Sequence, residues 1–194
     1  LFYKFKTYEK MEKREKLENI ERKVSNCGKC PLVKEANNAV PGEGNPDADI
    51  IFVGEAPGFN EDKQGRPFVG RAGKILDELL ESIGLKREDI FITNIVKHRP
   101  PGNRNPTSEE IKTYSSFLDE QLEIIKPKVI CCLGNFSSKY ILEKYGLNDK
   151  IDGITKIRGE VFKISTLQGL LKIIPLFHPA VATYDPNKLD TLKK

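Results

Sequence analysis

The sequence is poor in several residue types and has no long apolar run. It contains no tryptophan, one methionine and two histidines in 194 residues. No stretch approaches the roughly 18 apolar residues that a membrane-spanning helix needs. The N-terminal segment is charged throughout and lacks the apolar stretch of a signal peptide. We therefore expect no membrane partner and a cytoplasmic location.

Three enzyme signatures are also absent. The first predicted strand is not followed by G-x-G-x-x-G, which argues against a dinucleotide site. The sequence has no G-x-x-x-x-G-K-[ST], so it is not a P-loop ATPase. It has no G-x-S-x-G, so a serine nucleophile elbow is excluded.

The four cysteines fall into two pairs. Cys27 and Cys30 form a C-x-x-C, which predicts either half of a metal site or a redox pair. Cys131 and Cys132 lie in the apolar run "KVICCLG", where cysteines usually act as small buried hydrophobic residues.

The charge is mildly basic. A net charge of +4 permits a polyanionic partner without requiring one. Lys97, Arg99 and Arg104 cluster in "KHRPPGNR", which is either a nucleic-acid contact or a solvated loop.

Strand and helix patterns alternate along the chain. Strands are predicted at 49–54, 89–96, 128–134 and 172–180, with a possible edge strand at 160–165, and helices at about 8–25, 72–84, 107–125, 135–146 and 185–194. A knuckle rich in Gly, Pro and Asn fills 26–47. This alternation predicts a three-layer α/β/α sandwich around a mainly parallel sheet of about four strands, in one domain spanning 1–194.

Polar residues follow the predicted strands at the edge where ligands bind in parallel sheets. Glu55 follows the first strand, Asn94 closes the second, and His178 closes the last. The third strand leads into a helix start with Ser137. We expect these groups to share one site.

The stretch "GEAPGFNEDKQGRPFVGRAG" (54–73) places five glycines and several charges directly after a buried strand. It contributes Phe68, expected to be exposed, which could stack on a flat ring. The Asn94 amide can donate to a ring carbonyl and accept from a ring N–H, a pattern that fits uracil.

Together these motifs carry a family resemblance. "GEAPGFNEDKQGRPFVGRAG", "TNIVKHRPPGNRNPT", "KPKVICCLG" and "FHPA" resemble the family 4 uracil-DNA glycosylases over about residues 25–185. The resemblance implies a monofunctional, monomeric hydrolase that releases uracil from DNA in base excision repair. A catalytically silent DNA- or protein-binding member of the same fold, and an unrelated nucleotide-binding protein, remain alternatives.

The resemblance also implies site residues. It gives catalytic roles to Glu55, Glu61 and His178, uracil contacts to Gly54, Ala56, Gly58, Phe68 and Asn94, and DNA contacts to Arg71, Lys97, Arg99, Ser137, Val181 and Tyr184. His178 would donate to uracil O2, Glu61 would lie near uracil C5, and either Glu55 or Glu61 would position the water.

One family feature is incomplete. The family holds an iron–sulfur (4Fe–4S) cluster on four cysteines, two of which match Cys27 and Cys30, whereas His98 and Tyr114 stand at the other two positions. We expect no intact cluster and no cofactor required for the chemistry. The alternatives are a metal site on Cys27, Cys30 and His98, or a knuckle held by packing, by zinc or by a Cys27–Cys30 disulfide.

Overall fold

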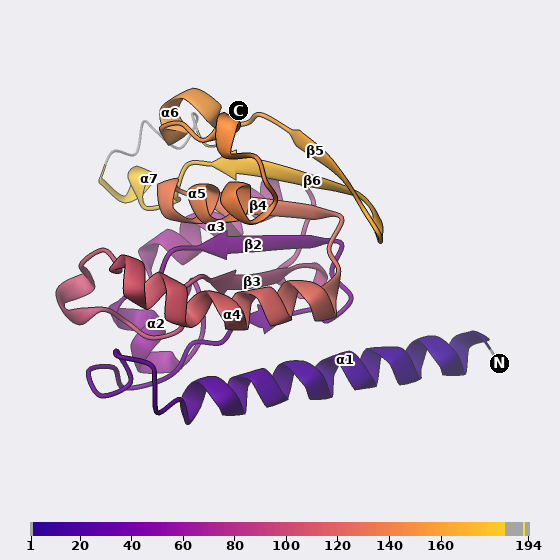
Figure 1. Ribbon diagram of the computed structural model, residues 1–194, viewed down its shortest axis with the longest axis horizontal. Helices are drawn as coiled ribbons and strands as arrows, with labels where there is room; N and C mark the ends of the chain where they lie inside the picture. Colours follow the sequence, from indigo (N-terminus) through magenta and orange to yellow (C-terminus); the bar gives the residue numbers. More distant parts are fainter. Residues whose placement is uncertain (1, 185–191, 193–194) are drawn as a thin grey trace.

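The computed structural model describes the backbone of residues 2–184 and 192 (Figure 1). The strands are β1 (Glu43–Gly44), β2 (Ile50–Gly54), β3 (Phe91–Asn94), β4 (Val129–Leu133), β5 (Phe162–Thr166) and β6 (Gly169–Leu176). The α-helices are α1 (Phe2–Ser25), α2 (Phe59–Gln64), α3 (Arg71–Ser82), α4 (Ser108–Ile125), α5 (Asn135–Lys144), α6 (Ile154–Ile157) and α7 (Val181–Tyr184). Three short 3-10 helices are η1 (Arg87–Asp89), η2 (Pro101–Asn103) and η3 (Asn148–Lys150).

The strands form one sheet in the order β1-β3-β2-β4-β6-β5. The four central strands run parallel to one another, and β1 and β5 pair antiparallel with them at the two edges. The α/β class and the four-strand parallel centre are confirmed, as is the edge strand at 160–165. The count of about four is corrected to six, because the edge strand β5 and the two-residue strand β1 are added, and β1 lies within a Gly/Pro-rich segment that carries no strand signal.

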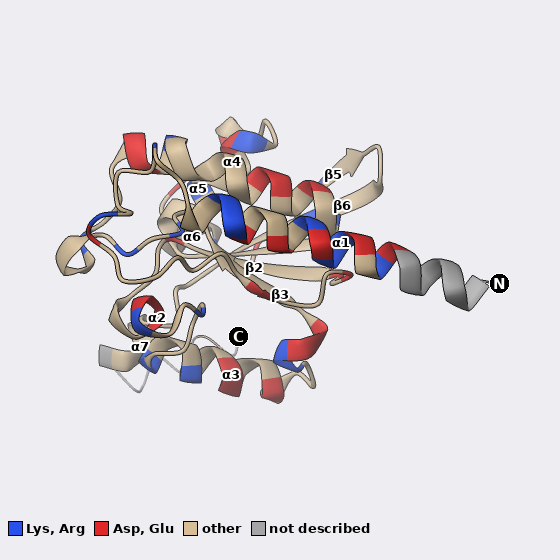
Figure 2. Ribbon diagram, turned by 90° about the horizontal axis from the view of Figure 1, so that it is seen from below, with Lys and Arg blue, Asp and Glu red and all other residues tan. Residues whose placement is uncertain are grey.

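Helices cover both faces of the sheet. Figure 2 shows α1, α4 and α5 on one side of the strands and α2, α3 and α7 on the other. Alternation along β2 matches this layering, because Ile51 and Val53 pack with α4 and α5 residues whereas Phe52 packs with Leu76 and Leu80 of α3.

α1 lies alongside α4 and extends beyond the body of the molecule (Figure 1). It begins at Phe2 rather than near residue 8. Ile20 and Val24 are buried, whereas Met11 is exposed, so the second half of this helix provides its buried contacts with the body of the molecule.

Helix α4 begins with the N-terminal cap that its sequence predicts. Thr107 caps α4 in a capping box with Glu110, as the "TSEE" pattern predicts.

The predicted helix at 185–194 lies outside the described residues, apart from Leu192. Among the residues described, none of the helices is long and apolar enough to cross a membrane.

Candidate active site

A pocket of about 550 Å³ opens at the carboxyl ends of the parallel strands. Of the predicted site residues, it is lined by Glu55, Ala56, Gly58, Glu61, Phe68, Arg71, Asn94 and His178. These come from four separate segments, which the sheet topology brings to one edge.

The floor of the pocket is built by close approach of three residues. Gly54 ends β2 directly beside Asn94, the last residue of β3. A Cβ at Gly54 would lie 2.3 Å from Asn94 Oδ1 and 2.7 Å from Phe68 Cζ. Only glycine therefore leaves both side chains where they are.

Phe68 stacks on His178, with ring centroids 5.6 Å apart and planes inclined by 30°. It is 5% exposed, so the expectation of an exposed ring is wrong: its far side packs in the core with Phe52 and Leu76. Its backbone has a φ of +51°, which is unusual for a residue other than glycine.

Arg87, which sequence reasoning missed, anchors this loop. Its guanidinium donates to the backbone oxygens of Pro67 and Phe68 and pairs with Glu43 and Asp77. A guanidinium that binds two consecutive backbone carbonyls stabilises the unusual backbone conformation of Phe68. The signal was hidden, because Arg87 lies in a separate charged loop of the chain.

Glu61 is clamped by the same loop. Its Oε1 accepts from the backbone N–H groups of Val69 at 2.9 Å and Gly70 at 2.7 Å. The carboxylate thereby fixes the loop between α2 and α3, while Oε2 lies beside Gly58.

His178 is fixed as one neutral tautomer. Its Nδ1 lies 3.1 Å from the backbone N–H of Ala180. A backbone N–H can only donate, so Nδ1 accepts and the proton of the neutral ring is on Nε2. Burial lowers the pKa of His178 to about 4, although the nearby Glu61 carboxylate opposes the shift.

Glu55 is the less constrained carboxylate. It is half-buried, and burial raises its pKa above the usual value. No hydrogen bond or ion pair among the described residues engages its side chain, in contrast to that of Glu61. It can therefore accept a hydrogen bond from a water molecule in the pocket.

The rim of the pocket is basic. Arg71 at the start of α3 is exposed. Arg99 donates to Asn103 at 2.6 Å and lies over the Phe59 ring. Arg104 also lines the pocket, but both of its outer nitrogens engage Glu110.

Two predicted DNA contacts are wrong because their side chains are buried. Lys97 is 0% exposed, and its ammonium donates to three oxygens inside the fold. Ser137 is also fully buried, and its hydroxyl donates to the Gly134 carbonyl.

Val181 and Tyr184 belong to α7, which packs against α3 beside the pocket. The Tyr184 side chain lies outside the described part of the chain.

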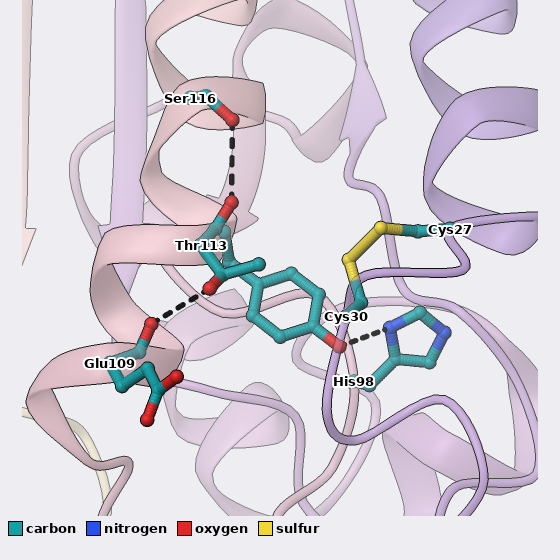
Figure 3. The surroundings of a disulfide bond; sticks show 7 residues. Cys27, Cys30, His98, Glu109, Thr113 and Ser116 are labelled. Carbon is teal, nitrogen blue, oxygen red and sulfur yellow. Dashed lines mark hydrogen bonds between the residues drawn. A yellow bond between two sulfur atoms is a disulfide. The ribbon is translucent and has the colours of Figure 1, made fainter.

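The knuckle is closed by a disulfide between Cys27 and Cys30 (Figure 3). His98 Nδ1 lies 3.0 Å from the Tyr114 hydroxyl, and both side chains are buried. Burial lowers the pKa of His98 and raises that of Tyr114.

This donor set does not fit an iron–sulfur cluster. Two sulfurs bonded to each other, an imidazole and a high-pKa phenol cannot replace four thiolates. In the described part of the chain, no three His, Cys, Asp or Glu side chains gather as a metal site. Because Cys27 and Cys30 are bonded to each other, the predicted metal site on Cys27, Cys30 and His98 gains no support here and stays a prediction.

The knuckle nevertheless supports the pocket. Ala56 lines the pocket and packs against the cluster formed by Cys30, Leu32, Val96 and Tyr114. From α2, the buried Asp62 accepts hydrogen bonds from the backbone of Asn37 and Asn38.

Comparisons with known proteins agree with this geometry. Residues 41–194 match the model of the uracil DNA glycosylase superfamily. The chain is 51% identical over 169 residues to a type-4 uracil-DNA glycosylase of Sulfurisphaera tokodaii, covering 87% of this chain and 76% of the relative. It is 47% identical to one of Archaeoglobus fulgidus (87% and 84% covered) and 48% identical to one of Saccharolobus solfataricus (86% and 77% covered).

Proposed function

Because this chain belongs to the uracil DNA glycosylase superfamily, we propose that it is itself a monofunctional uracil-DNA glycosylase. It hydrolyses the N-glycosidic bond of a deoxyuridine flipped out of DNA, releases uracil and leaves an abasic site for base excision repair. The observation that carries this proposal is the meeting of Asn94, Phe68 and His178 around one pocket.

Recognition of uracil rests on two residues. The flipped base enters the pocket and contacts Phe68, which lines the pocket beside His178 and is held by core packing. The Asn94 amide donates to one uracil carbonyl and accepts from the neighbouring ring N–H. Cytosine presents the reverse pattern at that edge and is rejected.

Departure of uracil as an anion is assisted by His178. The Nε2–H of its neutral ring donates to uracil O2, where negative charge develops as the bond breaks. The low pKa keeps the ring neutral, so Nδ1 can continue to accept from Ala180.

The two carboxylates have different tasks. We assign the water to Glu55, because its side chain is free and its raised pKa suits a base that orients water. Glu61 is committed to two backbone N–H groups, and it shapes the pocket near uracil C5, where thymine carries a methyl group.

DNA approaches the basic rim. Arg71 and Arg99 contact phosphates, and the segment from Ala180 to Tyr184 enters the duplex where the base leaves. We propose that the protein acts on DNA as a monomer, as one domain, in the cytoplasm.

We further propose that the knuckle works without the iron–sulfur cluster of the family. Packing around the His98–Tyr114 hydrogen bond replaces the metal as the support for Ala56. This bond does not depend on redox state, so it persists in a reducing cytoplasm, where the Cys27–Cys30 disulfide would open.

The test of function is an excision assay. Single-stranded and duplex oligonucleotides that carry one uracil are incubated with the protein and then treated with alkali. Cleavage at uracil is the expected result. A mobility shift without cleavage would instead support the silent DNA-binding alternative. If the assay shows no cleavage and no mobility shift, DNA is not the partner.

A further inference from the structure

Lys97 is a buried side chain with no countercharge among the described ion pairs. Its side chain is 0% exposed. None of the ion pairs among the described residues includes it. Burying a charge without a countercharge is costly, so such a group is expected where function requires it.

All three neighbours of the Lys97 nitrogen are acceptors. Nζ lies 2.6 Å from Thr93 Oγ1, 2.7 Å from the Asn94 carbonyl oxygen and 2.7 Å from Gln121 Oε1.

The orientation of two of these groups is fixed by Pro41. Its carbonyl oxygen receives Thr93 Oγ1 at 2.8 Å and Gln121 Nε2 at 2.8 Å, and a carbonyl can only accept. The Thr93 proton is thus used on Pro41, and the Gln121 oxygen faces Lys97. Three acceptors require three N–H donors, which only the charged ammonium has. Burial lowers the pKa of Lys97, and these three acceptors offset part of that cost.

The ammonium is connected to the pocket through the backbone. The ammonium donates to the carbonyl of Asn94. The N–H of the next residue, Ile95, donates to the Gly54 carbonyl at 3.0 Å, and the N–H of Val96 donates to the Glu55 carbonyl. Hydrogen bonds in such a chain polarise one another. Lys97 therefore links the strand end that carries Asn94 to the start of the Glu55 loop.

We propose that Lys97 is a positioning residue that locks Asn94 from behind and places a positive charge behind the uracil pocket, where it favours uracil leaving as an anion. The proposal rests on the proposed glycosylase function. Lys97 does not touch the base, and its charge acts across the buried interior, where electrostatic effects are stronger than in water.

The test compares two leaving groups. Single-turnover excision rates are measured on oligonucleotides that carry deoxyuridine or 5-fluorodeoxyuridine. Fluorine makes the departing base a more stable anion, so its loss depends less on help from the protein. The ratio of the two rates is independent of the folded fraction of each preparation.

Lys97→Met removes the charge and keeps an apolar side chain of similar length. We expect uracil excision to slow by about 10- to 100-fold, and 5-fluorouracil excision to slow by a clearly smaller factor. The ratio of the 5-fluorouracil rate to the uracil rate therefore rises. Equal slowing of both substrates, or no slowing, would overturn the proposal.

Gln121→Glu provides a second variant in case Lys97→Met does not fold. It introduces a countercharge from α4, outside the pocket, and we expect the rate ratio to rise as it does in Lys97→Met.

Thr93→Val is the matched control, because it removes one acceptor and leaves the charge, so the rate ratio should stay at the wild-type value. A ratio that rises equally in Thr93→Val, or does not rise in Gln121→Glu, would also contradict a role for the charge. If the wild-type protein excises neither base, the proposed function fails before Lys97 is in question.

Discussion

The uracil pocket and the knuckle differ in how much of the family pattern each retains. The pocket keeps Glu55, Phe68, Asn94 and His178 together at the edge of the sheet. The knuckle keeps two cysteines and replaces the other two ligands by His98 and Tyr114. Both regions share a wall, because Ala56 packs against one and lines the other.

This difference separates support from chemistry. A hydrogen bond between buried side chains and a closed apolar cluster can hold a loop as a metal does. The groups that touch the base cannot be exchanged so freely, because each must donate or accept at one atom. Substitutions in the pocket should therefore cost catalysis, and substitutions in the knuckle should cost stability.

The largest effect is expected for Asn94→Asp. The carboxylate loses the amide donor and repels the departing anion, so we expect uracil excision to fall by at least about 100-fold. Single-turnover rates measure the change, and Asn148→Asp on the exposed η3 turn is the control. Unchanged rate and selectivity would remove Asn94 from the site.

Gly54→Ala should follow. The new Cβ would come within 2.3 Å of Asn94 Oδ1, so the amide must move, and a displacement of about 1 Å can cost roughly 100-fold in rate. Gly28→Ala is the matched control, because a Cβ there meets no atom within 4 Å. If both variants excise uracil at the same rate, the close packing of the pocket floor does not matter to catalysis.

Opening the disulfide should affect stability more than rate. A four-residue loop predicts a loss of about 2 kcal/mol in unfolding free energy for Cys27→Ser/Cys30→Ser, with the excision rate retained. Denaturant unfolding measures the loss. A reductant should lower the wild-type midpoint and leave that of the double variant unchanged; equal shifts in both would place the effect elsewhere.

The smallest effect concerns protonation. An ordinary imidazole with a pKa of about 6.5 is mostly charged at pH 5.5. With a pKa near 4, His178 takes up its proton only as the pH falls toward that value, so it stays neutral and able to donate at pH 5.5. NMR titration of the two histidines measures this, and His178→Gln identifies the resonance. A His178 resonance that titrates near pH 6.5 would contradict the lowered pKa of the buried ring.

Sequence reasoning located the pocket because its residues stand directly after strands, and the alternation of strands and helices predicts that these strands run parallel. Asn94 and His178 were found in this way, as was the capping box at Thr107. Burial of Lys97 and Ser137 could not be read from a basic loop and a helix start, because it depends on which neighbours the fold supplies. Arg87 and β1 were missed because their partners are distant in sequence or lie in segments without periodicity.

The central claim is that a complete uracil pocket works on a knuckle without iron. It is tested most directly by measuring iron content and single-turnover uracil excision on the same preparations of the protein, before and after treatment with a chelator. We expect efficient excision at a rate that does not vary with iron content. Excision that rises in proportion to bound iron, or that is seen only with a full four-iron cluster, would contradict the account.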